Sequence, residues 1–377
     1  MEFDLTWILL GLPAAFALGW LASRLDLRQM RIENRRAPKA YFKGLNYLLN
    51  EQQDQAIDAF IEAVRNDPDT SELHFALGNL FRRRGEYERA VRVHEHLLSR
   101  ADLSRADRDR AQHALALDFL KAGLLDRAEA ALAKLEGTAF EAQARLARLA
   151  LYERTRDWVQ AGEIARLLEQ AEPGQFASRL AHYLCEQAAA RDGDAAESLL
   201  RQAMDLAPGA ARPRMDLAAR LQRQGRHADA LNLLLDATER APAWLPLMAA
   251  PLAELARAAS REDEVRRRLE ALYVEQPCLD LLEALVALDD QPQHARARLL
   301  SHLQREPSLV AAAAWLAGEP LGDEAQRPVL QRTLDHAVRP LRRYRCAACG
   351  FEARQHFWQC PGCQAWDSYP ARRVEEL

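Results

Sequence analysis

The stretch Ala56-Ile-Asp-Ala-Phe-Ile-Glu-Ala-Val-Arg-Asn-Asp-Pro68 decides the fold, because its pattern returns along most of the chain. A small residue opens the pattern, a large apolar residue (Phe60) follows one helical turn later, and a proline closes it twelve residues after the opening. Residues four apart share one face of a helix, and proline cannot continue a helix. Each copy therefore predicts a helix that packs closely against a neighbour and then ends.

The small residue recurs with a period of about 34 residues, which is the length of a helix–turn–helix repeat. It lies at Ala56, Ala90, Ala128, Ala161, Ala196, Ala230, Val265 and Ala295. The proline follows at Pro68, Pro173, Pro208, Pro242, Pro277 and Pro307, and the large apolar residue lies at Phe60, Leu132, Leu200, Leu234, Leu269 and Leu299.

Glycines complete the pattern. Gly44 and Gly78 lie twelve residues before a small residue and predict a close contact inside the first helix of a unit, whereas Gly85, Gly123 and Gly225 predict turns between paired helices. The sequence resembles tetratricopeptide repeats at Leu77-Gly78, Tyr87 and Ala90, and at Ala56, Phe60, Ala63 and Pro68. We therefore expect an all-α tetratricopeptide-repeat solenoid over residues 38–318, in which the third and fourth units are the most divergent.

A solenoid of helix pairs has a concave surface, lined by the first helix of each pair, that can bind peptides or proteins. An aromatic side chain, an amide and two arginines in the first three units could hold an acidic or amphipathic segment. The alternative is that Arg82-Arg83-Arg84 is only a solvated helix end. His94-Glu-His96 is interpreted as a solvent-exposed pair. The candidate groove residues are Tyr41, Phe75, Asn79, Arg82, Arg83 and His113.

Near the C-terminus, two Cys-x-x-Cys hooks are separated by ten residues. They are Cys346-Ala-Ala-Cys349 and Cys360-Pro-Gly-Cys363. Two hooks this close can place four thiolates at the corners of one tetrahedron, as in a structural zinc site or a rubredoxin-type iron site. Four thiolates suit both metals, so the sequence predicts one metal ion and leaves iron or zinc open.

Residues 341–377 are expected to form a small rubredoxin-like or zinc-ribbon domain around this ion. A structural role is favoured over electron transfer, and a redox Cys-x-x-Cys motif is the remaining alternative, although it would not need two copies. Cys185 and Cys278 lie in helical segments and are expected to be buried small apolar residues. Six aromatic residues are expected to cover the metal and pack it against the solenoid: Tyr344, Phe351, Phe357, Trp358, Trp366 and Tyr369.

Residues 5–22 read LTWILLGLPAAFALGWLA and contain no charge. Eighteen helical residues span roughly 27 Å, close to the thickness of the hydrocarbon core of a bilayer. A cleaved signal peptide and a buried helix are the alternatives, but Glu2 and Asp4 stand where a signal peptide has basic residues. We therefore expect residues 1–23 to form a single transmembrane anchor.

Basic residues follow the anchor and none precedes it, so the positive-inside rule predicts that the rest of the chain lies in the cytoplasm. Thiols also stay reduced and free to bind a metal there. Residues 24–37 are expected to be a basic juxtamembrane linker, and residues 319–340 a helix that connects the repeats to the tail.

Composition and the absence of known motifs limit the classes of function to which the protein can belong. The 377 residues are 49% hydrophobic and carry a net charge of −4, with both signs interspersed, so nothing indicates nucleic-acid binding. We find no phosphate loop, dinucleotide-binding glycine pattern, zinc-protease motif or nucleophile elbow. Four thiolates would also fill the coordination of the metal and leave no position for a substrate. The sequence therefore predicts a protein that is not an enzyme.

The whole chain resembles the lipopolysaccharide assembly protein B family of Gram-negative bacteria. The resemblance rests on the leader that ends WLASRLDLRQM, on residues 35–51 (RRAPKAYFKGLNYLLNE) and on the segment from Tyr344 to Cys363. It implies a single-pass protein of the inner membrane that faces the cytoplasm. It also implies that the metal ligands are Cys346, Cys349, Cys360 and Cys363, and that the metal is iron.

The resemblance further implies an adaptor that limits lipid A synthesis. Such an adaptor promotes degradation of the committed-step deacetylase by a membrane AAA+ protease, and it can gather other lipopolysaccharide-synthesis or transport proteins at the inner membrane. Two alternatives stay open. One is a redox or metal-sensing protein whose tail changes state, and the other is a purely structural scaffold for membrane enzymes.

Overall fold

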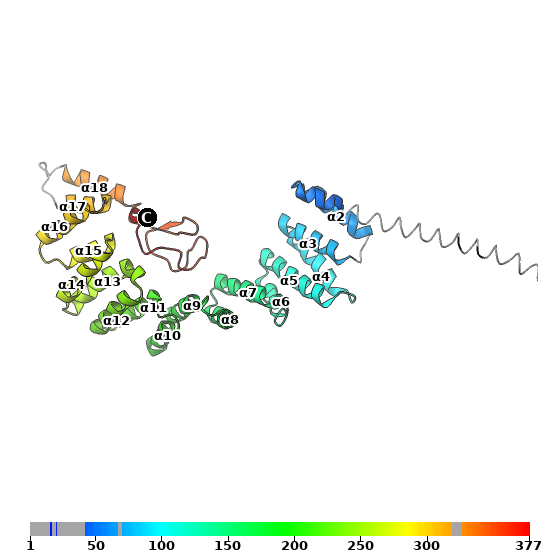
Figure 1. Cartoon of the computed structure of the whole chain (residues 1–377), viewed down its shortest axis with the longest axis horizontal. Coiled ribbons are helices and arrows are strands. Elements are labelled where there is room, and N and C mark those ends of the chain that lie inside the picture. The colour runs from blue at the N-terminus through cyan, green and yellow to red at the C-terminus, as the bar shows by residue number, and fades with distance from the viewer. Residues whose placement is uncertain (1–15, 17–19, 21–41, 67–69, 319–325) are drawn as a thin grey trace, which may run out of the picture. The chain divides into compact units, whose positions relative to one another are not determined.

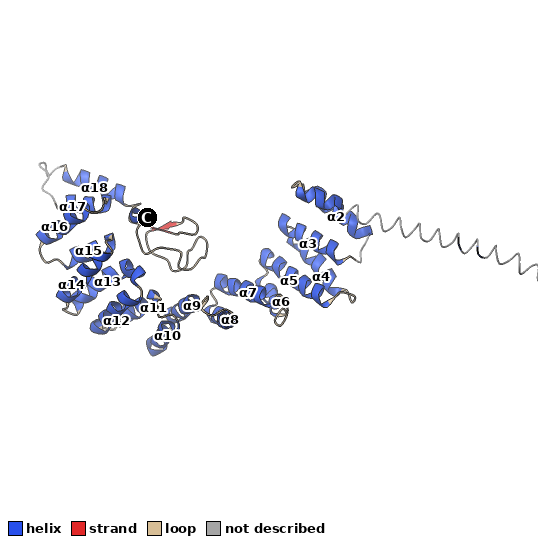
Figure 2. Cartoon of the chain, in the orientation of Figure 1, coloured by secondary structure: helices blue, strands red, loops and turns tan. Residues whose placement is uncertain are grey.

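Helices build most of the chain that the structure describes. The structure is a computed structural model, and it describes Phe16, Trp20 and residues 42–66, 70–318 and 326–377 (Figure 1). Near the C-terminus the chain instead forms loops, turns and one two-stranded sheet (Figure 2). The predicted all-α repeat array with a small C-terminal domain is confirmed for these residues.

Helices alternate as first and second members of pairs. The first members are residues 42–49, α3 (Ser71–Arg84), α5 (Arg105–Ala122), α7 (Glu141–Thr155), α9 (Ala177–Ala189), α11 (Ala211–Arg223), α13 (Leu245–Ala258) and α15 (Leu279–Leu288). The second members are α2 (Gln53–Asn66), α4 (Tyr87–Ser99), α6 (Leu125–Ala133), α8 (Trp158–Ala171), α10 (Gly193–Leu206), α12 (His227–Arg240), α14 (Glu262–Glu275) and α16 (Pro292–Leu303). A short 3-10 helix, η1 (Pro242–Trp244), precedes α13, and α17 (Leu309–Ala317) and α18 (Arg327–Val338) follow the pairs.

The small residues of the repeat lie in the second helix of each pair, as predicted. All are completely buried except Ala295, which is half-buried. The large residues one turn later are buried beside them, from Phe60 at 0% exposure to Leu299 at 9%. A side chain no larger than valine at the crossing lets two helix backbones approach, and the larger neighbour fills the space beside it.

The glycines predicted to mark close contacts do so. A Cβ atom added at Gly78 would lie 2.5 Å from the imidazole of His94, and one added at Gly44 would lie 2.8 Å from the ring of Phe60. His94 is therefore completely buried. The interpretation of His94 as solvent-exposed is wrong, because the missing side chain at Gly78 makes room for the imidazole between α3 and α4.

Replacing Gly78 with alanine is expected to destabilise the protein by about 1–3 kcal/mol, because the added methyl group overlaps a buried ring that cannot move into solvent. Gly162 in α8 is the matched control. The nearest atom to a Cβ there is 3.8 Å away, so alanine fits and is favoured in a helix by about 1 kcal/mol. Urea denaturation of the two variants measures the difference, and equal stabilities would contradict the close-contact interpretation.

The described chain divides into two compact units, residues 1–151 and 152–377, and the boundary falls within α7. α7 is the first helix of the fourth pair, one of the two units predicted to be most divergent. In the segments that the structure describes, no helix is both long and apolar enough to cross a membrane. The predicted anchor and the basic linker lie outside those segments, apart from Phe16 and Trp20.

Candidate metal centre

Two turns of the same design hold the four cysteines. The Cys346 N–H donates to Phe351 O (2.9 Å), and the Gly350 N–H donates back to Cys346 O (2.9 Å). Fourteen residues later, the Cys360 N–H donates to Ala365 O and the Gln364 N–H to Cys360 O, both at 2.8 Å. Gly350 and Gln364 occupy equivalent positions and both have a positive φ, 77° and 64°.

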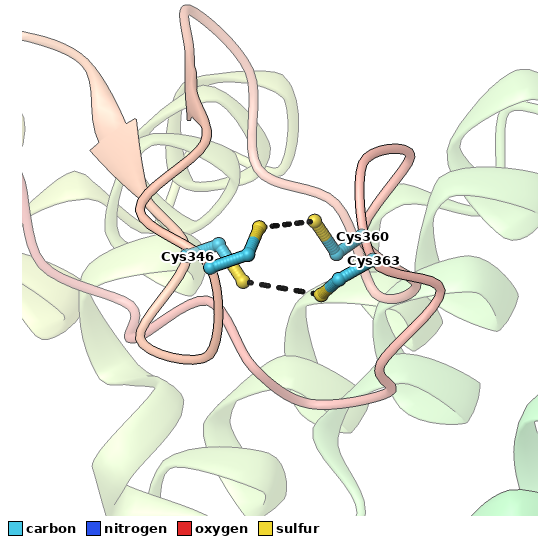
Figure 3. A group of neighbouring side chains, drawn as sticks. Cys346, Cys360 and Cys363 are labelled. Atoms are coloured by element: carbon cyan, nitrogen blue, oxygen red, sulfur yellow. Dashed lines mark hydrogen bonds between the residues drawn. The ribbon is translucent and has the colours of Figure 1, made fainter. Parts of the chain in front are cut away.

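Antiparallel backbone pairing closes each turn. β1 (Tyr344–Arg345) pairs with β2 (Glu352–Ala353) in antiparallel register, and a bridge joins Gln359 to Trp366 around the second hook. Cys346 of the first turn faces Cys360 and Cys363 of the second across the space between the turns (Figure 3). The chain thus repeats one metal-binding turn to assemble four ligands from two hooks.

The spacing of the sulfur atoms fits a metal ion. Cys346 Sγ lies 3.8 Å from Cys363 Sγ, and Cys349 Sγ lies 3.7 Å from Cys360 Sγ. All four sulfurs lie within 4.8 Å of one another. A metal–sulfur bond of about 2.3 Å requires sulfur separations of about 3.8 Å in a regular tetrahedron. The predicted ligands are therefore brought together, and one metal ion bound by four thiolates fits the site.

Electrostatics at the site also favour a cation. Burial opposes ionisation of Cys346, but hydrogen bonding with Ser368 and with the Cys349 and Ala348 backbone outweighs it and lowers the pKa of this thiol to about 6. At Cys349 the Phe351 N–H favours ionisation, yet partial desolvation and the neighbouring sulfurs of the other three cysteines raise the pKa to about 12. Four adjacent thiolates repel one another, and a divalent metal ion compensates for that charge.

Half of the metal site faces the repeats and half faces solvent. Cys346 and Cys360 are 1% and 0% exposed, and they pack with Tyr344, Tyr369 and Leu247 of α13. Cys349 and Cys363 are exposed. The buried cysteines therefore connect the metal directly to the surface on which this small domain lies.

Aromatic side chains contribute to that contact. The Trp366 ring stacks on His182 of α9, with centroids 4.8 Å apart, and meets Trp158 and Tyr183 edge-on. Trp358 lies 4.9 Å from Trp244, centroid to centroid. The prediction that aromatic residues pack this domain on the solenoid is confirmed for the tryptophans, whereas Phe351 is 44% exposed.

One buried carboxylate, Glu153 of α7, accepts hydrogen bonds from two of these rings. The Trp366 indole N–H donates to Glu153 Oε1 (2.8 Å), and the Tyr183 hydroxyl donates to the same oxygen. Arg179 donates there too, at 2.6 Å from Nη2. A buried charge is tolerated only when it is paired and hydrogen-bonded, so Glu153 depends on the tail for one of its donors.

The last residues of the chain cap the repeats. Glu376 accepts from the Leu279 N–H at the start of α15 (2.8 Å), and Glu375 accepts from the Leu309 N–H at the start of α17 (2.6 Å) and from the Ser308 hydroxyl (2.7 Å). α17 has no acidic residue in its own first turn. A carboxylate at a helix N-terminus satisfies free N–H groups and complements the helix dipole.

An arginine adjoins these acidic caps. Arg373 forms a two-pronged ion pair with buried Asp280 of α15, with Nη2 2.6 Å from Oδ1 and Nε 3.1 Å from Oδ2. Its guanidinium also lies 4.3 Å from the centroid of the Tyr344 ring. Because Tyr344 packs on Cys346 and Cys360, the ion pair, the caps and the metal belong to one connected contact.

The predicted partner groove is brought together only in part. Phe75 is 1% exposed and packs with Leu97 and Ala111, so the prediction that it lines an open groove is wrong. Arg82 donates to Asp118 Oδ1 (2.9 Å) and to Asn79 Oδ1 (2.5 Å). Asp118 Oδ2 is also hydrogen-bonded to His94 Nδ1 (2.5 Å). Two of the predicted groove residues, Asn79 and Arg82, thus belong to a hydrogen-bond network within the N-terminal compact unit.

The other groove residues remain predictions. Arg83 is exposed, and His113 is half-buried and stacks on Phe140 with centroids 4.9 Å apart. Tyr41 lies outside the described residues.

His113 makes the stability of the N-terminal compact unit depend on pH. Burial, and secondarily the charge of Arg82, lower the pKa of His113 below its ordinary value. The folded state then binds fewer protons than the unfolded state, so stability is full above the unfolded pKa of about 6.5 and declines as the pH falls through it. Urea denaturation from pH 8 to pH 5 should show less of this decline in His113→Gln. An identical pH dependence in the two proteins would contradict it.

Sequence reasoning missed the residues that receive the tail: Glu153, His182, Asp280 and the N-termini of α15 and α17. One signal was present, at α17, which has no acidic residue in its own first turn and receives Glu375 there. No such signal marked α15, because Asp280 already lies in its first turn.

Known proteins resemble the chain both in its C-terminal domain and over nearly its whole length. The family described as rubredoxin metal binding domain matches residues 344–369. Over 98% of its length the chain is 31% identical to lipopolysaccharide assembly protein B of Escherichia coli (strain K12), and the match covers 99% of that protein. The same-named protein of Haemophilus influenzae is 26% identical, with 96% of both chains covered.

Solved structures also resemble parts of the chain. A tetratricopeptide repeat protein from Parabacteroides merdae covers 67% of the chain with a TM-score of 0.36 and 14% identity, and the match spans 98% of that protein. Naa15/Naa10 bound to HypK-THB covers 81% with a TM-score of 0.46 and 17% identity, and the match spans 47% of that chain.

Proposed function

This chain belongs to the lipopolysaccharide assembly protein B family, and we propose that it is a membrane-anchored adaptor, not an enzyme, that regulates lipopolysaccharide synthesis. Membership over 98% of the chain carries this proposal. Repeat helices provide binding surface for other proteins, and a metal ion held by four thiolates has no free position for a substrate. Both features suit a protein that brings other proteins together.

The adaptor promotes proteolysis of the committed-step lipid A deacetylase by a membrane AAA+ protease. Residues 1–23 anchor the chain in the inner membrane with residues 24–377 on the cytoplasmic side. Confinement to the same membrane raises the effective concentration of the anchored chain around the protease, so that even a weak contact with the substrate becomes productive.

Depletion of the protein tests this role. The half-life of the deacetylase, measured after translation is blocked, should lengthen on depletion and return to normal when the full chain is restored. A chain without residues 1–23 should fail to restore it. An unchanged half-life on depletion would contradict the adaptor role and favour a scaffold for membrane enzymes.

The metal has a structural part in this proposal. Cys346, Cys349, Cys360 and Cys363 would hold it, and the bound ion would fix the two turns in place. Hydrogen bonds of Trp366, Glu375 and Glu376 then hold the domain on the repeats. Purified protein that contains one zinc ion and no visible absorption would oppose an electron-transfer role.

A further inference from the structure

The two sides of the metal centre differ in accessibility. Cys346 and Cys360 are buried against the tyrosines and Leu247, whereas Cys349 and Cys363, one from each hook, are exposed. A small reagent in solution can therefore reach one edge of the sulfur tetrahedron and not the opposite one. Phe351, which lies beside this edge, is itself 44% exposed and shields it incompletely.

We propose that the Cys349–Cys363 edge is where a peroxide oxidises this protein, forming a Cys349–Cys363 disulfide and releasing the metal ion. Thiolates are the reactive form of cysteine, and exposure selects which of them react. The buried pair is protected by packing. The product therefore joins the two hooks to each other and does not close either Cys-x-x-Cys motif on itself. This inference does not rest on the proposed function.

The reaction balances with peroxide as the oxidant. One exposed thiolate attacks a peroxide oxygen, the oxygen–oxygen bond breaks, and the cysteine becomes a sulfenic acid as hydroxide leaves. The other exposed thiolate attacks that sulfur and expels a second hydroxide. The two sulfurs start within 4.8 Å of each other. They then approach to about 2 Å, the length of a disulfide bond. Two electrons pass from sulfur to peroxide, and the metal loses two of its four ligands.

Loss of the metal should loosen the tail from the repeats. The buried cysteines then take up protons, and nothing fixes the two turns relative to each other. Tyr344 and Tyr369 pack on these cysteines, and the Arg373 guanidinium lies over the Tyr344 ring. Oxidation at the exposed edge is therefore transmitted through the buried half of the metal site to the ion pair with Asp280.

The metal-loaded full chain, treated with hydrogen peroxide, tests the inference. A chromogenic chelator records metal release, and alkylation with peptide mapping identifies the disulfide. We expect release to accompany a Cys349–Cys363 disulfide while Cys346 and Cys360 remain thiols. Cys185 and Cys278, 1% and 2% exposed, are internal controls that should stay reduced. A disulfide within either hook, or oxidation without metal release, would overturn the proposal.

A variant that leaves every ligand in place sharpens the test. A Cβ atom at Gly362 would lie 3.6 Å from Cys349 Sγ and 3.5 Å from Phe351, in ordinary contact. Gly362→Ala should therefore cover the sulfur and slow metal release severalfold at unchanged metal content. Gly209→Ala, with open space around the new methyl group, should not change the rate. Equal rates for the wild type and Gly362→Ala would contradict attack at the exposed edge.

Discussion

Replacing Cys360 with serine is expected to release the metal and unfold residues 341–377 while the repeats stay helical. Cys360 is completely buried, and the small domain around it has only two strands of two residues each. So short a segment cannot bury enough apolar surface to fold alone. In small zinc domains the metal contributes about 10–16 kcal/mol, which is folding free energy. Loss of a ligand therefore removes most of what holds the tail together.

Metal analysis and limited trypsin digestion measure this effect. The wild type should hold one metal ion per chain and resist cleavage at Arg345, Arg354 and Arg373. The variant should hold far less metal and lose its C-terminal fragment quickly, with little change in the helical circular dichroism. Cys185→Ser, a buried cysteine away from the site, should keep its metal. Wild-type metal content and cleavage pattern in Cys360→Ser would refute this expectation.

Truncating Trp366 to alanine is the second large effect, about 3–5 kcal/mol of destabilisation with the metal still bound. The indole lies among Trp158, His182 and Tyr183, and its N–H donates to Glu153. Trp366→Phe keeps the ring contact and loses the hydrogen bond to a charged group, so it should cost about 1.5–3 kcal/mol. Urea denaturation of the metal-loaded proteins measures both values.

A double-mutant cycle separates the hydrogen bond from the rest of the contact. Glu153→Gln alone disturbs Arg179 and Tyr183 as well, but its effect should shrink in the Trp366→Phe background, where the indole N–H is already gone. Phe351→Ala is the matched aromatic control, since Phe351 belongs to the same domain and is 44% exposed, and it should change stability by less than about 0.5 kcal/mol. Strict additivity in the cycle would contradict a direct bond.

Much of the repeat array could be predicted because its pattern is local. A small residue at Ala230 with a large one at Leu234 requires only that a helix pack against its neighbour in sequence, and both residues are buried as expected. Gly78 marks a close approach for the same reason. The four cysteines are similarly local, because hook spacing alone determines whether four thiolates can converge.

Contacts between distant segments could not be predicted in this way. Trp366 reaches Glu153, 213 residues earlier, and Glu376 reaches the start of α15, 97 residues earlier. No periodicity links such positions. The solvent-exposed interpretation of His94 was wrong for a related reason, since its ring is hydrogen-bonded to Asp118 on another helix, α5. A polar residue can be buried whenever a partner from another helix satisfies it.

Amide hydrogen exchange at the starts of α15 and α17 tests most directly whether the metal holds the tail on the repeats. The Leu279, Leu309 and Val310 N–H groups donate to Glu376 and Glu375, so their protection reports docking at positions far from the cysteines. When a chelator removes the metal, these amides should lose protection while those in the middle of α10 and α12 keep theirs. Unchanged protection at all three amides in the metal-free protein would contradict the account.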